Sequence, residues 1–335
     1  MNIFWFAISA FISLNCMGSD VTSTYDKYYS NAGRLSQKDL SYLRGKDIIL
    51  VPGILSEVFS REDERGNVDF SALSSDYFAS QVNHLKHTLK LPTQKLFVSS
   101  RSVDETKIRI TQALNATRMN NRKAVLITHS LGGLAMLDYL LESDESDLEC
   151  IEGILFLQTP FFGTPIATVF LDNPYYADKW LAPFLPFFNT SVETIEYLSV
   201  GQRMKFMDEN KDRIREILAR IPVLTMSGVT NRDRTVFKPA VDVMEHGCLL
   251  NALRRCLSGK LYPGPYDLSD GMVPLNSSRL NYVDSVVLQG IDHAEPIVKL
   301  PFQKVSREIM TESLLKMLLD KSNNRLVGIP LEFEG

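Results

Sequence analysis

The sequence predicts an α/β fold with a mostly parallel central sheet and helices on both faces. Apolar runs that do not alternate with polar residues are typical of strands buried on both faces. Such runs lie at residues 47–51, 124–128, 153–158, 221–226 and 284–289. Longer segments with helical spacing separate these runs, as parallel crossover connections require. The interval at 161–210 is far longer than an ordinary connection between a strand and its neighbours, and it indicates an insertion.

The other elements follow from the same periodicities. A short apolar run at residues 96–98 predicts one more strand. Residues 103–119 and 131–141 have the apolar spacing of helices, and an amphipathic helix at 307–319 closes the fold. The charged stretch within residues 56–77 reads as an exposed loop.

Composition excludes several functional classes. The chain has 335 residues with 36 basic and 40 acidic side chains, which give a net charge of −4 and no basic excess for a nucleic-acid partner. A hydrophobic fraction of 44% with 18 Gly and 15 Pro excludes disordered and collagen-like chains. The four cysteines are too few for a disulfide-built scaffold.

The N-terminus indicates export. Residues 3–14 form an apolar run that is shorter than the ~20 residues of a membrane-spanning helix. The run has the length of the apolar region of a signal peptide, so we expect residues 1–18 to direct export to the periplasm or the exterior. Residues 14–16 resemble a relaxed lipoprotein box, which leaves lipid anchoring at Cys16, and association with a membrane surface, as an alternative. An ordinary buried N-terminal segment is the other. Residues 19–42 read as a polar arm before a domain at 43–325.

In an oxidising compartment, two cysteines could form a bridge. Cys248 and Cys256 are eight positions apart, and both a local disulfide and two packed thiols on a helix face remain open. Cys150 would then have no partner in the mature chain.

A candidate nucleophile lies where a buried strand is followed by a helix. The sequence T-H-S-L-G-G occupies residues 128–133. A sharp strand–turn–helix holds a serine, here Ser130, in a strained conformation with its hydroxyl exposed. The backbone N–H of Leu131 would begin the helix and point at a developing oxyanion. The alternative is an ordinary helix start with an incidental serine.

These residues resemble the nucleophile elbow of the α/β-hydrolases, particularly the lipases and esterases. Thr128 stands where the pattern G-x-S-x-G has its first glycine. The resemblance covers about residues 45–320. It implies a serine hydrolase that acts on carboxylic esters, including lipid or acyl esters, without cofactor or metal. It also implies that an acid and then a histidine follow the serine along the chain.

The candidate partners of the serine lie late in the chain. The sequence D-G-M-V-P that begins at Asp270 resembles the loop that carries the acid in many lipases. Of the two histidines that follow Ser130, only His293 is downstream of Asp270, so we expect Asp270 and His293 to complete a triad. Asp242 with His246 is a second pair, and Asp292 is another candidate acid. An ordinary turn aspartate and a surface histidine are the alternatives without a catalytic role.

A Pro-Gly turn supplies the candidate oxyanion hole. Gly53 follows the first buried strand, at the place where lipases have His-Gly and some relatives Pro-Gly. The resemblance implies that the next residue, Ile54, donates its N–H to the oxyanion together with Leu131. Leu55 is the alternative donor, and an ordinary strand-ending turn is the alternative structure.

The insertion is rich in aromatic residues. The sequence T-P-F-F-G-T-P at residues 159–165 resembles a segment that follows a strand in lipases. Phe occupies six of the 28 positions from 161 to 188, namely 161, 162, 170, 184, 187 and 188. We expect a helical cap that binds an acyl chain, with contacts from Phe161, Phe162, Trp180 and Phe184. A packed helical subdomain without a role in substrate binding is the alternative.

The resulting functional hypothesis is an esterase or lipase with a Ser-Asp-His triad and an acyl-enzyme intermediate. A thioesterase or acyltransferase would use the same triad. A non-catalytic binding protein of the same fold is the hypothesis from a different class.

Overall fold

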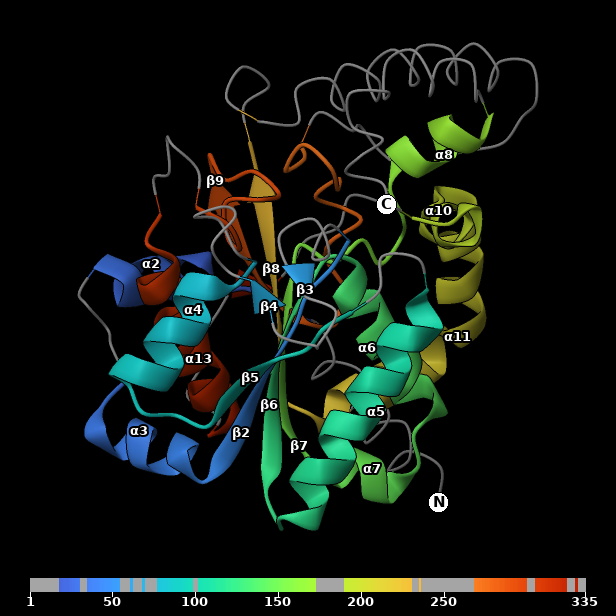
Figure 1. Ribbon diagram of the computed structural model, residues 1–335. Coiled ribbons are helices and arrows are strands. Elements are labelled where there is room, and N and C mark those ends of the chain that lie inside the picture. Colours follow the sequence, from blue (N-terminus) through green and yellow to red (C-terminus); the bar gives the residue numbers. More distant parts are fainter. Residues whose placement is uncertain are drawn as a thin grey trace, which may run out of the picture.

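The computed structural model describes eleven segments of the chain (Figure 1). They are residues 18–30, 35–54, 61–62, 68–69, 77–98, 102–172, 190–230, 235, 268–299, 305–323 and 329–330.

A twisted eight-stranded sheet forms the centre of the described structure, in the order β10-β1-β9-β8-β7-β6-β2-β5. Its strands are β1 (Ser19–Asp20), β2 (Lys46–Val51), β5 (Thr93–Lys95), β6 (Lys123–His129), β7 (Ile151–Leu157), β8 (Val223–Val229), β9 (Asp284–Gln289) and β10 (Ile329–Pro330). The seven strands from β1 to β5 in this order run parallel, and β10 is antiparallel at the edge. A separate two-stranded ribbon pairs β3 (Arg61–Glu62) with β4 (Val68–Asp69). The predicted mostly parallel α/β sheet is confirmed.

Helices cover both faces of the sheet (Figure 1). One face carries α2 (Thr22–Ser30), α3 (Gln37–Arg44), α4 (Ala79–Asn83), a π-helical turn at His84–Thr88, and α13 (Arg307–Ser322). The other carries α5 (Val103–Met119), α6 (Leu131–Glu142), α7 (Glu145–Glu149), α8 (Pro165–Asp172), α10 (Val192–Leu198) and α11 (Val200–Arg220). Strand β2 illustrates the division: Ile48 and Leu50 enter the first core, whereas Ile49 and Val51 enter the second. Two buried faces explain why the strands have no polar alternation.

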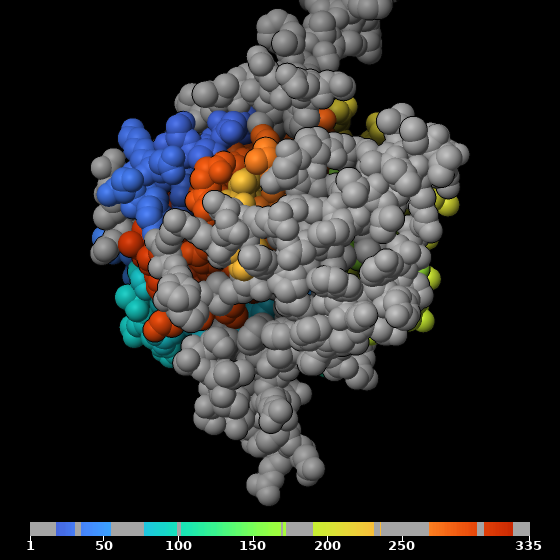
Figure 2. Space-filling view, turned by 90° about the horizontal axis from the view of Figure 1, so that it is seen from above, coloured from blue at the N-terminus to red at the C-terminus, as the bar shows by residue number. Residues whose placement is uncertain are grey.

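The segment expected to be a polar arm at residues 19–42 is part of the fold in its described parts. Strand β1 pairs with β9, and Thr22 accepts a hydrogen bond from the N–H of Val287 (2.9 Å). Tyr25 of α2 is only 3% exposed. Figure 2 shows α2 in blue next to C-terminal residues in orange and red. The prediction missed this because tyrosine, although polar at its tip, has a large apolar ring to bury.

Element bounds agree with the sequence prediction for α5 and β9 and differ for β5. The expected strand at 96–98 lies instead at residues 93–95, where Ile48 of β2 pairs with Thr93. Leu96 and Val98 are buried beyond the end of that strand. The apolar residues at 96–98 indicated burial and not a strand. The strand is defined by its hydrogen-bonded register with β2.

Several expectations fall outside the described residues. They are the N-terminal segment with Cys16, the pair Asp242 and His246, the two cysteines Cys248 and Cys256, and Leu55, Trp180 and Phe184. Export and lipid anchoring stay predictions. Cys150 is buried with a free thiol. In the part of the chain that the structure describes, no helix combines the length and hydropathy needed to cross a bilayer.

Substitution of Tyr25 tests whether α2 contributes to the folded domain. We expect Tyr25→Ala to lower the free energy of unfolding in urea by about 3 kcal/mol, because it removes a buried ring and leaves a cavity. The control Asp26→Ala changes an exposed neighbour and should stay within about 0.5 kcal/mol of the wild type. Equal stabilities of the two variants would mean that α2 does not support the core.

Candidate active site

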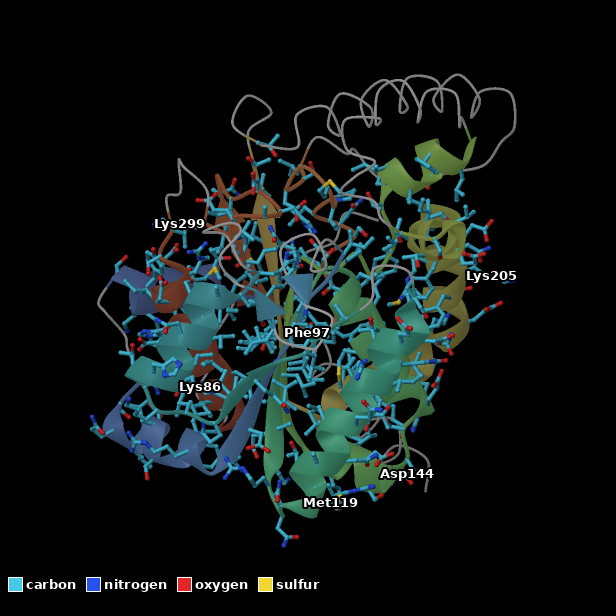
Figure 3. The ribbon with its side chains drawn as sticks, in the orientation of Figure 1. Lys86, Phe97, Met119, Asp144, Lys205 and Lys299 are labelled. Atoms are coloured by element: carbon cyan, nitrogen blue, oxygen red, sulfur yellow. The ribbon has the colours of Figure 1, made fainter. Side chains whose placement is uncertain are left out.

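The candidate residues lie at the carboxyl end of the parallel strands, where loops of α/β sheets form binding sites. Val51 of β2 pairs with Thr128 of β6, so the Pro-Gly turn and the T-H-S-L-G-G turn leave the sheet side by side. Figure 3 shows Lys299, six residues after His293, at this end of the sheet and Met119 at the opposite end.

Ser130 has the strained backbone expected of a nucleophile elbow. Its φ of 53° and ψ of −126° lie outside the regions that side chains normally favour. The Ser130 N–H donates to the carbonyl of Leu157 (3.0 Å), and the Ser130 carbonyl accepts from the N–H of Gly133 (3.0 Å). Thr128, in place of the usual glycine, is fully buried and its hydroxyl donates to the carbonyl of Leu155 (3.2 Å). The backbone carbonyl on β7 thus provides an acceptor for the hydroxyl of this buried, β-branched side chain.

Two glycines allow the turns to pack against each other. A Cβ atom on Gly132 would lie 2.2 Å from the carbonyl oxygen of Pro52, and one on Gly53 would lie 2.7 Å from Cβ of Ser130. Both distances are too short for any side chain. The backbone of the Pro-Gly turn therefore lies directly on the Ser130 turn, as an oxyanion hole shared by the two would require.

His293 connects Ser130 to Asp270. His293 Nδ1 lies 2.7 Å from Asp270 Oδ2, and His293 Nε2 lies 2.9 Å from Ser130 Oγ. Since a carboxylate only accepts hydrogen bonds, Nδ1 carries the proton, and Nε2 is left to accept from the serine hydroxyl. The structure thus brings together the three residues that the sequence suggested as a triad.

The Asp270 carboxylate is held from two sides. Its Oδ1 accepts from the N–H groups of Met272 (2.9 Å) and Val273 (2.7 Å), which leaves Oδ2 directed at His293. The Asp270 carbonyl also accepts from the N–H of His293 (2.8 Å). The alternative acid, Asp292, uses Oδ1 to accept from two backbone N–H groups of the turn after His293. Asp270, at 1% exposure, is therefore the carboxylate that bonds the imidazole.

The candidate oxyanion donors are two backbone amides. Leu131 is the first residue of α6, where an N–H has no partner within the helix. The N–H of Gly53 donates to the Tyr77 hydroxyl (2.9 Å), so this amide is already engaged. Ile54, the next residue, lines the cleft above Ser130. This arrangement favours Ile54 over Gly53 as the second donor.

An apolar cleft opens at Ser130 and His293, with an empty volume of about 670 Å³ that includes open solvent. Its described lining is mostly apolar, with walls from α8, α10 and the loop after Asp270: Ile54, Ser130, Pro160, Thr164, Ile166, Ala167, Phe170, Thr190, Ile195, Leu198, Met272, Val273 and His293. A mostly apolar lining with a few polar groups is typical of a site for an organic ligand.

Two of the four expected aromatic contacts, Phe161 and Phe162, lie outside the cleft. Phe161 is fully buried against Phe156, with ring centroids 5.2 Å apart, and it is a core residue instead of a cleft residue. Phe162 is partly buried against the same core and also does not line the cleft. Within the expected cap, α10 and the first half of α11 form part of the helical layer, and Phe170 on α8 is the aromatic residue that lines the cleft in the described part of the chain.

Two residues near the site had no signal in the sequence. Tyr77 and Gln158 both contact the imidazole of His129, which lies next to Ser130 and is 1% exposed. Burial, reinforced by the nearby His293, holds the pKa of His129 well below its usual value, so this imidazole is neutral. Among the described residues, no group of three or more His, Cys, Asp or Glu side chains could hold a metal ion.

The buried His129 predicts a pH-dependent stability. The unfolded chain takes up a proton at His129 near pH 6.5, whereas the folded chain does not, so acid favours unfolding. We expect this group's contribution to be complete above about pH 6.5 and to fall by up to about 1.4 kcal/mol per pH unit below it. The titratable groups that face His129 are Tyr77 and His293.

Urea unfolding at pH 7, 6 and 5 measures this dependence. The variant His129→Asn lacks the titrating imidazole, so its unfolding free energy should decline less steeply toward pH 5. Parallel pH profiles for the two proteins would contradict a neutral buried His129.

Comparisons place this geometry among known folds. No protein-family model and no curated protein sequence matches the chain. The mature form of a lipase from Bacillus licheniformis superimposes with a TM-score of 0.53 and 16% identity, covering 84% of this chain and 92% of that one. A metagenomic carboxyl esterase superimposes with a TM-score of 0.59 and 16% identity, covering 83% of this chain and 76% of that one. Lipase 1 from Pelosinus fermentans superimposes with a TM-score of 0.51 and 12% identity, covering 82% of this chain and 98% of that one.

At these identities the likeness concerns the fold. The parallel sheet and its flanking helices are shared with structures of lipases and esterases. The chain has the α/β-hydrolase fold of these lipases and esterases.

Proposed function

We propose that the protein is a serine hydrolase that cleaves carboxylic esters with an apolar acyl group. The observation that carries the proposal is the hydrogen-bonded chain from Ser130 through His293 to Asp270, with distances of 2.9 and 2.7 Å, at the mouth of an apolar cleft. Nucleophile, base and orienting acid in this order are the parts of acyl-transfer chemistry.

The first half of the reaction forms the acyl-enzyme. His293 accepts the Ser130 proton at Nε2 as Oγ attacks the ester carbonyl, and Asp270 stabilises the resulting imidazolium through Nδ1–H. The N–H groups of Leu131 and Ile54 stabilise the tetrahedral oxyanion. When the intermediate collapses, the imidazolium donates its proton to the leaving alcohol.

The second half releases the acid. Water enters the position vacated by the alcohol, His293 removes its proton, and the hydroxide attacks the acyl carbon. Collapse of this second intermediate returns the proton to Ser130. Because the same steps would serve a thioester, or an acceptor alcohol in place of water, a thioesterase and an acyltransferase remain the alternatives.

The cleft supports a preference for an apolar acyl chain. Ile166, Ala167 and Phe170 of α8 line it together with Ile195 and Leu198 of the neighbouring α10. Each methylene that leaves water for such a surface contributes about 0.8 kcal/mol, or about fourfold in kcat/KM. A non-catalytic binding protein could use the same cleft, but it would have no need for the aligned Ser130, His293 and Asp270.

Triad substitutions test the chemistry. We expect the wild type to hydrolyse p-nitrophenyl esters and to react with a fluorophosphonate probe. Ser130→Ala and His293→Ala should lower kcat by about 10,000-fold or more, and Asp270→Asn by about 10,000-fold, because the three groups act as one unit. Asp292→Asn is the control for the acid and should keep far more activity than Asp270→Asn.

Two outcomes would contradict this assignment. A wild-type protein that reacts with neither esters nor the probe would exclude the hydrolase. Activity of Ser130→Ala at the wild-type level would exclude Ser130 as the nucleophile. A parallel panel of acyl-coenzyme A thioesters and of alcohols as acceptors separates hydrolysis of esters from the two alternatives.

A series of acyl lengths tests the cleft. We expect kcat/KM to rise from acetyl to decanoyl p-nitrophenyl esters, by up to about fourfold per buried methylene. Ala167→Phe fills the cleft from α8 and should lower activity on decanoate much more than on acetate. Ala116→Phe, at an exposed position of α5, is the matched control. Equal turnover of acetyl and decanoyl esters would contradict an acyl-binding cleft.

A further inference from the structure

Two buried polar residues next to the site have no part in the triad. His129 precedes Ser130 at the end of β6, and Tyr77 precedes α4; each is 1% exposed. His129 Nδ1 lies 2.5 Å from the Tyr77 hydroxyl, which lies 2.9 Å from the N–H of Gly53. One imidazole thus reaches, through one tyrosine, the turn at residues 52–54, which we call the oxyanion loop.

The other side of the same imidazole reaches the segment at residues 292–295, which we call the base loop. His129 Nε2 lies 3.0 Å from the carbonyl of His293 and 3.1 Å from Gln158 Oε1. The amide nitrogen of Gln158 in turn donates to the carbonyl of Asp292 (3.0 Å). Two carbonyls of the base loop are therefore held by His129 and Gln158.

The donors and acceptors fix the direction of this chain. The carbonyl of His293 can only accept, so the neutral His129 carries its proton on Nε2 and leaves Nδ1 to accept the Tyr77 hydroxyl proton, while the Tyr77 oxygen accepts from the Gly53 N–H. Both neighbours of His129 Nε2, the His293 carbonyl and Gln158 Oε1, are acceptors, which agrees with this tautomer. Burial that lowers the His129 pKa and raises the Tyr77 pKa keeps both groups neutral in this arrangement.

Resting on the proposed function, we propose that Tyr77 and His129 are positioning residues that couple the oxyanion loop to the base loop. Neither touches the reacting atoms. Tyr77 holds the Gly53 amide, and the chain continues from this anchored point to the N–H of Ile54. His129 fixes the main chain that carries the base. The distance from Ile54 N–H to the oxyanion and that from His293 to Ser130 are thereby set by one chain of hydrogen bonds.

Such coupling would stabilise the transition state more than the bound substrate, and so would change kcat more than KM. An oxyanion donor contributes mainly once charge develops on the substrate oxygen, and a shift of about 1 Å in a positioning group costs about 100-fold in rate. We therefore expect Tyr77→Phe to lower kcat by about 10- to 100-fold with KM unchanged within about twofold. Tyr25→Phe, which removes a buried tyrosine hydroxyl from α2, is the control and should leave kcat unchanged.

A double-mutant cycle tests whether the two residues form one chain. His129→Asn loses the bond to the His293 carbonyl and should lower kcat to a similar extent as Tyr77→Phe. If both act through one chain, the double variant is only as slow as the slower single variant. Multiplied effects of the two substitutions, or a kcat of Tyr77→Phe within about twofold of the wild type, would overturn the coupling.

Spectra of isotopically labelled protein give a readout that does not depend on turnover. Wild-type His129 should be the Nε2–H tautomer, and Tyr77→Phe should shift the amide signals of Ile54 and Leu131 together with the imidazole signals of His293. Shifts confined to residues next to position 77 would overturn the coupling. A wild type without esterase activity would refute the proposed function alone, and these spectra would still decide the coupling.

Discussion

The strained backbone of Ser130 is the constraint around which the rest of the site is arranged. A non-glycine residue with a φ of 53° costs about 1–3 kcal/mol, so its surroundings must hold it there. The hold comes from hydrogen bonds to Leu157 and Gly133 and from close contacts of the helix start with the Pro-Gly turn. The conformation that exposes the hydroxyl is thus maintained by the ends of three neighbouring strands, β2, β6 and β7.

Parallel strand order explains how distant residues meet. Because β2, β6, β7, β8 and β9 all point the same way, each delivers its following loop to one end of the sheet. Asp270 lies between β8 and β9 along the chain, and His293 follows β9, so both reach Ser130 although more than a hundred residues separate them from it. Hydrogen bonds within these loops then fix the two residues. The amides of Met272 and Val273 hold the Asp270 carboxylate, and the Asp292 carboxylate accepts from two backbone amides of the base loop that carries His293.

Sequence reasoning succeeded where one local property decides the structure. Apolar runs located the central strands, and the strand-to-helix change at Ser130 together with the D-G-M-V-P loop indicated the residues that the structure brings together. It failed where a long-range partner decides. Strand β5 is defined by its register with β2, and α2 by the burial of Tyr25 against the C-terminal part of the fold. Tyr77 had no local signal, because its contacts are with Gly53 and His129.

The position of Phe161 shows why aromatic composition alone did not locate the wall of the cleft. The fully buried Arg203 of α11 donates from Nε to the carbonyl of Phe161 (3.2 Å), and its guanidinium lies over the rings of Tyr197 (4.7 Å) and Phe206 (4.2 Å). Its guanidinium is also 3.9 Å from the carboxylate of Asp138 on α6. These contacts bind the turn after β7 to α11 and α6, and the Phe161 ring of this turn packs against Phe156 in the core. The apolar wall of the cleft continues with Ile166 and Phe170 on α8, and α8 contacts α11, which in turn contacts α6, the helix that begins directly after Ser130.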